Sequence, residues 1–138
     1  MTTEDKELLL KDLCGRLPYG TICRCRTTED STWWNTDHRI FGIIGNKVDV
    51  GSDILDAEQI KPYLRPMSSM TEEEKKMVCS MNGLSDTELN DRIEYPNMYV
   101  QNYTIETFDL FNAHHIDYRG LSKKGFVLEA PEGMYKTE

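Results

Sequence analysis

The chain has 138 residues, enough for one domain or for two small lobes with a buried core. Asp and Glu outnumber Lys and Arg by 24 to 16, so the formal net charge is −8. A protein that neutralises nucleic-acid phosphates is normally basic, so this balance disfavours DNA, RNA and anionic membranes as partners. The acidic excess is uneven: residues 1–66 carry a net charge of −2 and residues 67–138 carry −6.

The beginning of the chain lacks the features of a secretory signal peptide. Acidic residues come early, and the apolar run Leu8–Leu10 is short. No stretch approaches the roughly 20 apolar residues that a membrane-spanning helix needs. We therefore expect a cytoplasmic protein without a membrane partner.

Residues 1–66 predict one helix followed by a small antiparallel sheet. A stripe of leucines indicates the helix over residues 4–16, with Thr3 as its N-cap. Gly45-Asn46 is a two-residue hairpin signal, because both residues tolerate positive φ. Alternating and β-branched residues predict the strands at 20–27, 39–44 and 47–50, with an extended piece within 57–64. The pattern favours a small twisted sheet or an SH3-like barrel.

Two of the four cysteines, Cys23 and Cys25, alternate along the first expected strand and so share a face. In the cytoplasm they would remain reduced thiols. Zinc sites use paired Cys-x-x-Cys or His spacings, which Cys-x-Cys with the distant His38 fits poorly. We favour small buried side chains as their role.

Residues 67–138 predict a helical lobe. Thr71 and Glu74 have the spacing of a capping box, which starts a helix that runs to about Met81 and ends at Gly83. The chain then divides into lobes 1–66 and 67–138, with one compact domain as the alternative.

The rest of this lobe predicts a loop and two further helices. Residues 84–103 indicate a long ordered loop that contains one possible helix start, because Tyr-Pro-Asn must interrupt any helix there. Tyr103 and Phe108 flank a threonine cap with the spacing of a hydrophobic staple. Asp117 is placed to cap a short helix over residues 118–124.

The densest polar cluster of the chain contains two histidines, Asp117, Tyr118 and Arg119. A hydrolase would use His114 or His115 as general base, with Asp117 as its orienter or as a metal ligand. Adjacent residues on a helix point roughly 100° apart, so they rarely share one ion. The interpretation that we favour is structural: Asp117 caps a helix, one histidine ends the helix before it, and Arg119 pairs with a carboxylate.

Paired tryptophans in a polar stretch, Trp33 and Trp34, form a second candidate surface. Tryptophan is enriched in interface hot spots, so both could be exposed contact residues. One of them could equally fold over the edge of the sheet. The sequence leaves these alternatives open.

Three stretches, Lys6–Tyr19, Ile60–Glu74 and Phe108–Tyr135, resemble a family of small uncharacterised proteins of gut Bacteroidetes-type bacteria and their phages or prophage-like elements. The resemblance implies a mobile-element context. It implies no activity, no cofactor and no catalytic residues.

We therefore predict an α+β protein that acts as a non-enzymatic accessory or interaction protein, with a protein partner and without a cofactor or metal. The candidate contact residues are Trp33, Trp34, His114, Asp117, Tyr118 and Arg119. Neither the identity of the partner nor the oligomeric state is indicated.

Two alternative functions remain. A helix-turn-helix over residues 104–124 would present Arg119, Lys123 and Lys124 to DNA. A metal-dependent hydrolase would use His114 or His115 together with Asp117.

Overall fold

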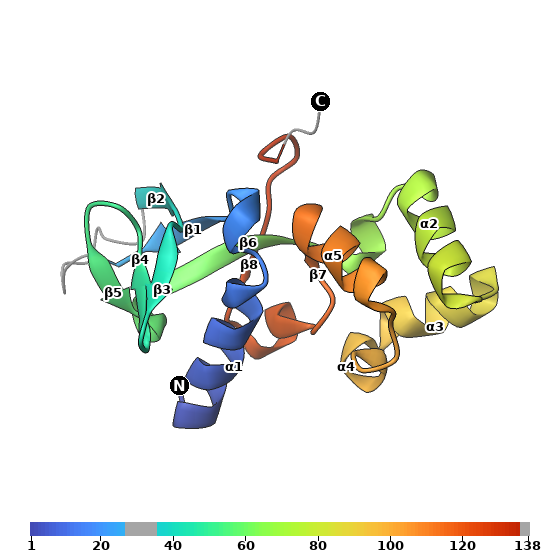
Figure 1. Ribbon diagram of the computed structural model, residues 1–138, viewed down its shortest axis with the longest axis horizontal. Coiled ribbons are helices and arrows are strands. Elements are labelled where there is room, and N and C mark those ends of the chain that lie inside the picture. Colours follow the sequence, from blue (N-terminus) through green and yellow to red (C-terminus); the bar gives the residue numbers. More distant parts are fainter. Residues whose placement is uncertain (27–35, 136–138) are drawn as a thin grey trace. The chain divides into compact units, whose positions relative to one another are not determined.

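The protein is described from a computed structural model, in which residues 1–26 and 36–135 are placed. Helices and strands are both abundant, so the fold is α+β, as predicted (Figure 1). The chain divides into two compact units. The first is Met1–Tyr63 together with Phe126–Leu128, and the second is Leu64–Gly125 together with the segment that starts at Glu129.

The first unit contains an amino-terminal helix, α1 (Thr3–Cys14), and two antiparallel sets of strands. The side chain of Thr2, rather than Thr3, caps this helix and accepts a hydrogen bond from the Asp5 amide. In the first set, β1 (Ile22–Cys25) lies between β2 (Thr36–Arg39) and the first half of β6 (Ile60–Pro66). The second set is the sheet β3 (Gly42–Ile44), β4 (Lys47–Asp49) and β5 (Ile54–Asp56).

The predicted hairpin at Gly45-Asn46 is confirmed, because these residues join the paired strands β3 and β4 and Gly45 has a φ of 61°. The described strands pair in open order, β2-β1-β6-β7 and β3-β4-β5, and these pairings do not close a barrel. The SH3-like interpretation therefore stays a prediction.

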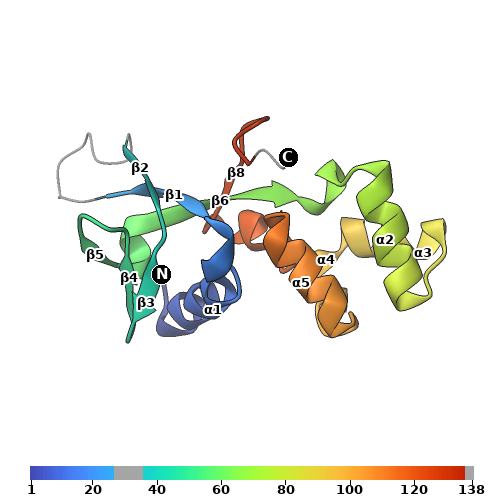
Figure 2. The ribbon, with the colours of Figure 1, turned by 45° about the horizontal axis from the view of Figure 1, so that its top comes forward.

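The described part of the second unit contains four α-helices, which are labelled α2 to α5 in Figure 2, and the short strand β7. The helices are α2 (Glu72–Asn82), α3 (Asp86–Glu94), α4 (Pro96–Tyr99) and α5 (Ile105–Ala113). Strand β7 (Ile116–Asp117) runs parallel to the end of β6, with Arg65 opposite Ile116, and β8 (Leu128–Glu129) also pairs with β6.

The predicted long loop at residues 84–103 is wrong, because this segment holds α3 and α4. Ser85 and Glu88 form a capping box that starts α3. Pro96 interrupts one helix and begins the next, since proline lacks the N–H that a first helical turn leaves unused.

The predicted helix over residues 118–124 is confirmed only over its last four residues. Asp117 does accept hydrogen bonds from the amides of Leu121 and Ser122, at 2.9 and 3.0 Å. The segment that follows is only a 3₁₀ helix, Leu121–Lys124, between two glycines with positive φ. An α-helix that could present Lys123 and Lys124 to a DNA groove is therefore not formed here.

The core of the second unit is aromatic and aliphatic. Its buried members are Met67, Met70, Val78, Leu89, Tyr103, Leu110, Phe111, Ile116 and Tyr118. The predicted staple is confirmed, since the rings of Tyr103 and Phe108 meet edge to face with their centroids 5.9 Å apart. Among the described residues, no helix has both the length and the apolar character required to cross a bilayer.

Candidate functional site

A carboxylate at the start of α2 organises the polar centre of the second unit. Glu74 accepts two hydrogen bonds from Arg65, 2.9 Å from Nη1 to Oε2 and 2.8 Å from Nη2 to Oε1. Its Oε1 also accepts from the Thr71 amide at 2.8 Å, as the predicted capping box requires. Its Oε2 lies 2.7 Å from Nδ1 of His114. One side chain therefore joins the end of β6, the cap of α2 and the end of α5.

The electrostatics of this centre keep Glu74 ionised. Burial by itself raises the pKa of the Glu74 carboxyl. The hydrogen bonds from Arg65, the Thr71 amide and His114, together with the charge of Arg65, outweigh burial and hold this pKa at about 2. The side chain of Glu74 is 6% exposed, so its charge is balanced by protein groups rather than by water.

The two histidines have different environments. His114 ends α5, and its amide donates to Leu110 O, so the prediction that one histidine ends this helix is confirmed. Because the ionised carboxylate of Glu74 can only accept, Nδ1 of His114 donates the hydrogen of this bond. His115 is 5% exposed, has a φ of 61°, and stacks on Tyr135 with the ring centroids 3.6 Å apart.

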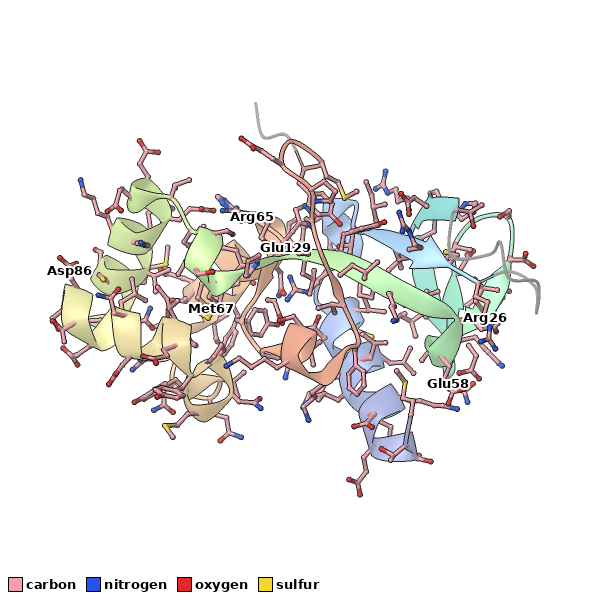
Figure 3. The ribbon with its side chains drawn as sticks, turned by 180° about the vertical axis from the view of Figure 1, so that it is seen from behind. Arg26, Glu58, Arg65, Met67, Asp86 and Glu129 are labelled. Atoms are coloured by element: carbon pink, nitrogen blue, oxygen red, sulfur yellow. The ribbon has the colours of Figure 1, made fainter. Side chains whose placement is uncertain are left out.

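These groups line a cavity of about 650 Å³ within the second unit, which we call the Arg65 groove. One wall is the segment Glu129–Tyr135, tied to β6 by the hydrogen bond from Ala130 N to Leu64 O at 2.9 Å. Arg65 lies on β6 and Glu129 lies on this wall, and both residues are labelled in Figure 3. The lining residues are Arg65, Pro66, Ser69, Thr71, Glu73, Glu74, Met77, His114, His115, Glu129, Ala130, Pro131, Glu132, Gly133 and Tyr135.

The charge of the groove is acidic once its internal pairs are counted. Arg65 donates to Glu74, to His114 O at 3.3 Å and to Ser69 O at 3.0 Å, so its guanidinium is committed to protein acceptors. The exposed carboxylates of Glu73, Glu129 and Glu132 remain on the lining.

The arrangement can bind and orient a hydrogen-bond donor, and a His–Glu pair can also remove a proton. Nucleophilic catalysis would need a hydroxyl or thiol held beside the histidine. The two aliphatic hydroxyls of the lining are otherwise engaged: Ser69 donates to Pro66 O at 2.7 Å, and Thr71 Oγ1 accepts from the Glu74 amide at 3.2 Å. Recognition is therefore the better supported use of the groove.

The residues predicted to make contacts have different surroundings in the structure. Of these, His114 lines the Arg65 groove. Asp117 is buried and engaged by the 3₁₀ helix, and Tyr118 is 3% exposed and stacks on Phe111. Arg119 lies with its guanidinium carbon 5.3 Å from the centroid of the Tyr118 ring.

The tryptophan pair, Trp33 and Trp34, lies outside the described residues. The contact roles predicted for these tryptophans and for Asp117, Tyr118 and Arg119 stay predictions.

The polar cluster of His114, His115 and Asp117 does not form a set of metal ligands. The described ranges contain no group of three His, Cys, Asp or Glu side chains that could hold an ion. Asp117 binds backbone amides, while Nδ1 of His114 binds Glu74. The metal-dependent alternative thus has no ligand set in the described part of the chain.

Arg65 and Glu74 were not predicted to belong to a site. The capping box accounted for Glu74, and Arg65 was assigned to a lobe boundary. The available signal was Arg65 itself, a cation that directly follows Tyr63 and Leu64 in an extended segment and precedes a proline.

No protein-family model matches the chain, and comparison with curated proteins and with solved structures likewise gives no significant match. These comparisons therefore assign neither a family nor an activity.

Proposed function

We propose that the protein is a non-enzymatic interaction protein that binds an extended basic segment of a protein partner in the Arg65 groove. The observation that carries this proposal is the charge of the groove: its arginine is neutralised internally, and three exposed carboxylates are left on the lining. The resemblance to proteins of bacterial mobile elements supports a place for this interaction in such an element.

The size and the construction of the groove suit this role. A volume of about 650 Å³ lies within the range of pockets that hold a ligand or several side chains. The bonds among Arg65, Glu74 and His114 fix one wall before a partner arrives, so less conformational entropy is lost on binding.

A lysine or arginine side chain matches both the polar and the apolar parts of the lining. Its charged end would meet the exposed carboxylates of the lining. Its aliphatic stem would lie along Met77, Ala130 and Pro131, since long basic side chains bury their methylenes on apolar surface.

The test is selection of peptides from a random displayed library, followed by fluorescence-polarisation titration of the selected peptides. We expect enrichment of Lys and Arg, and binding that weakens as salt screens the charges. Glu129→Gln combined with Glu132→Gln should weaken binding about ten-fold, because two surface charge pairs are lost.

The matched control is Glu72→Gln combined with Glu106→Gln, which removes the same charge from exposed positions outside the lining. Binding to this control should stay close to that of the unmodified chain. Selection of acidic or purely apolar peptides, or an equal loss in both double variants, would contradict the proposal.

A further inference from the structure

A second chemical feature lies in the first unit, where two thiols share one face of β1. Sγ of Cys23 lies 3.4 Å from Sγ of Cys25, and both residues are 0% exposed. Pairing on both sides holds this strand: Cys23 is opposite His38 of β2 and Pro62 of β6. The two sulfur atoms are thus in contact inside the unit, at positions that the backbone keeps fixed.

The spacing of the backbone permits a disulfide bond between these sulfur atoms, but its geometry would be strained. Residues two apart along a strand have Cα atoms about 6.6–6.8 Å apart. Disulfides span Cα distances of roughly 4.4–6.8 Å, so this pair stands at the long end of the range. A bond formed there would be strained and readily reduced, unlike a permanent structural disulfide.

The contact also makes the two thiols unequal. The hydrogen bond from Cys23 lowers the pKa of the Cys25 thiol, and it outweighs burial and the negative charges of Asp37 and Asp53, which raise it. The same contact and burial raise the pKa of the Cys23 thiol. These opposite directions make Cys25 the better candidate for the attacking thiolate.

We propose that Cys23 and Cys25 form a reversible intramolecular disulfide when the protein meets a small hydroperoxide, with Cys25 as the attacking sulfur and Cys23 as the resolving one. This site is independent of the Arg65 groove and of the function proposed for it. The burial of both thiols selects the oxidant: a peroxide close in size to water can reach them during small openings, whereas a bulky disulfide cannot.

The reaction balances in two steps. The Cys25 thiolate attacks one peroxide oxygen, the O–O bond breaks, and Cys25 becomes a sulfenic acid while the departing oxygen takes up a proton to give water. The sulfur of Cys23 then attacks the Cys25 sulfur, the S–O bond breaks, and the hydroxyl leaves as a second water with the proton of Cys23. Hydrogen peroxide gains two electrons, and the two thiols lose them.

The experiment uses the full chain with Cys14→Ser and Cys79→Ser, so that just the proposed pair can react. The folded protein is treated with hydrogen peroxide, and catalase then removes the peroxide. The protein is unfolded in the presence of N-ethylmaleimide, and its mass is measured by mass spectrometry. We expect the loss of two hydrogen atoms and no alkylation, with alkylation of both cysteines restored by dithiothreitol.

Two further variants assign the roles. With Cys23→Ser, Cys25 should stop at the sulfenic acid, which dimedone traps. With Cys25→Ser, Cys23 should remain alkylatable under the same treatment. Circular dichroism shows whether each variant is folded, and the result for the parent pair does not depend on either variant.

Three results would overturn the proposal. They are alkylation of both cysteines after peroxide treatment, direct conversion to sulfinic or sulfonic acids without a disulfide, and oxidation that occurs only after the chain has been unfolded in urea.

Discussion

Both units contain an arginine–carboxylate pair, and the two pairs differ in what surrounds them. In the first unit, Nε of Arg16, two residues after the end of α1, lies 2.8 Å from Oδ2 of Asp12, and both side chains are 0% exposed. In the second unit, Nη2 of Arg65 lies 2.8 Å from Oε1 of Glu74, with 24% and 6% of these side chains exposed. The distances are equal, but the first pair is enclosed and the second lines a cavity.

This difference in exposure decides which ion pair can only stabilise the fold and which one can also take part in recognition. An enclosed ion pair touches no solvent, so a ligand cannot reach it and its effect is confined to stability. The pair at Glu74 has the same internal bonds, but its carboxylate also holds His114, which lines the Arg65 groove. Enclosure, rather than the type of residue, distinguishes the two.

The largest effect should follow from breaking the enclosed pair. Asp12→Ala leaves the Arg16 guanidinium buried without its carboxylate, and we expect a loss of about 3–5 kcal/mol in the free energy of unfolding. Urea denaturation monitored by circular dichroism measures it. Replacing both residues, Asp12→Leu with Arg16→Met, should recover most of the loss. A loss below about 1 kcal/mol for the single change would mean that water reaches Arg16.

The next effect concerns Glu74 and depends on pH. Its pKa is lowered from 4.5 to about 2 on folding, so its contribution to stability is complete above pH 4.5 and is lost as the pH falls from 4.5 toward 2. We expect Glu74→Gln to cost about 2–3 kcal/mol at pH 7. The difference between the two proteins should shrink toward zero near pH 2, where the native carboxyl is protonated as well.

The measurement is the free energy of unfolding in urea across that range of pH, for the unmodified chain and for Glu74→Gln. Glu72→Gln is the control, since Glu72 lies two residues away on the same helix and its side chain is 84% exposed. The control should follow the unmodified chain. A gap between the unmodified chain and Glu74→Gln that does not change with pH would show that Glu74 contributes by shape rather than by charge.

Features held together by nearby residues could be predicted from the sequence. The capping box at Thr71, the hairpin at Gly45-Asn46 and the staple of Tyr103 and Phe108 are each decided within a few positions by hydrogen bonding, allowed φ or side-chain contact. The α+β class follows from the same local patterns, because a helix-spaced stripe and alternating strands occupy separate stretches.

The Arg65 groove could not be predicted in this way. Its central bonds join Glu74 to Arg65, nine positions earlier, and to His114, forty positions later. The capping box also gave Glu74 a complete local explanation, and the structure shows that one carboxylate can serve a helix cap and a distant arginine at once.

The two errors of secondary structure have local causes. Pro96 was taken as a helix breaker although it begins α4, and Gly120 with Gly125 confines the helix after Asp117 to one 3₁₀ turn. Pro96 lies where one helix ends and the next begins. The positive φ of Gly120 and Gly125 limits the length of the helix between them.

The smallest effect compares the capping boxes of the two units. Thr2 caps α1 through hydrogen bonds that are exposed to solvent, whereas Thr71 caps α2 beside a Glu74 that Arg65 holds in place. We expect Thr71→Ala to cost about 1 kcal/mol and Thr2→Ala about 0.5 kcal/mol, measured by urea denaturation. Thr→Ser at either position keeps the hydroxyl and should change stability by a few tenths of a kcal/mol at most. Equal losses of stability from the two alanine changes would show that the bond between Arg65 and Glu74 adds nothing to the cap of α2. The link that Glu74 makes between β6 and α2 would then consist of the ion pair alone.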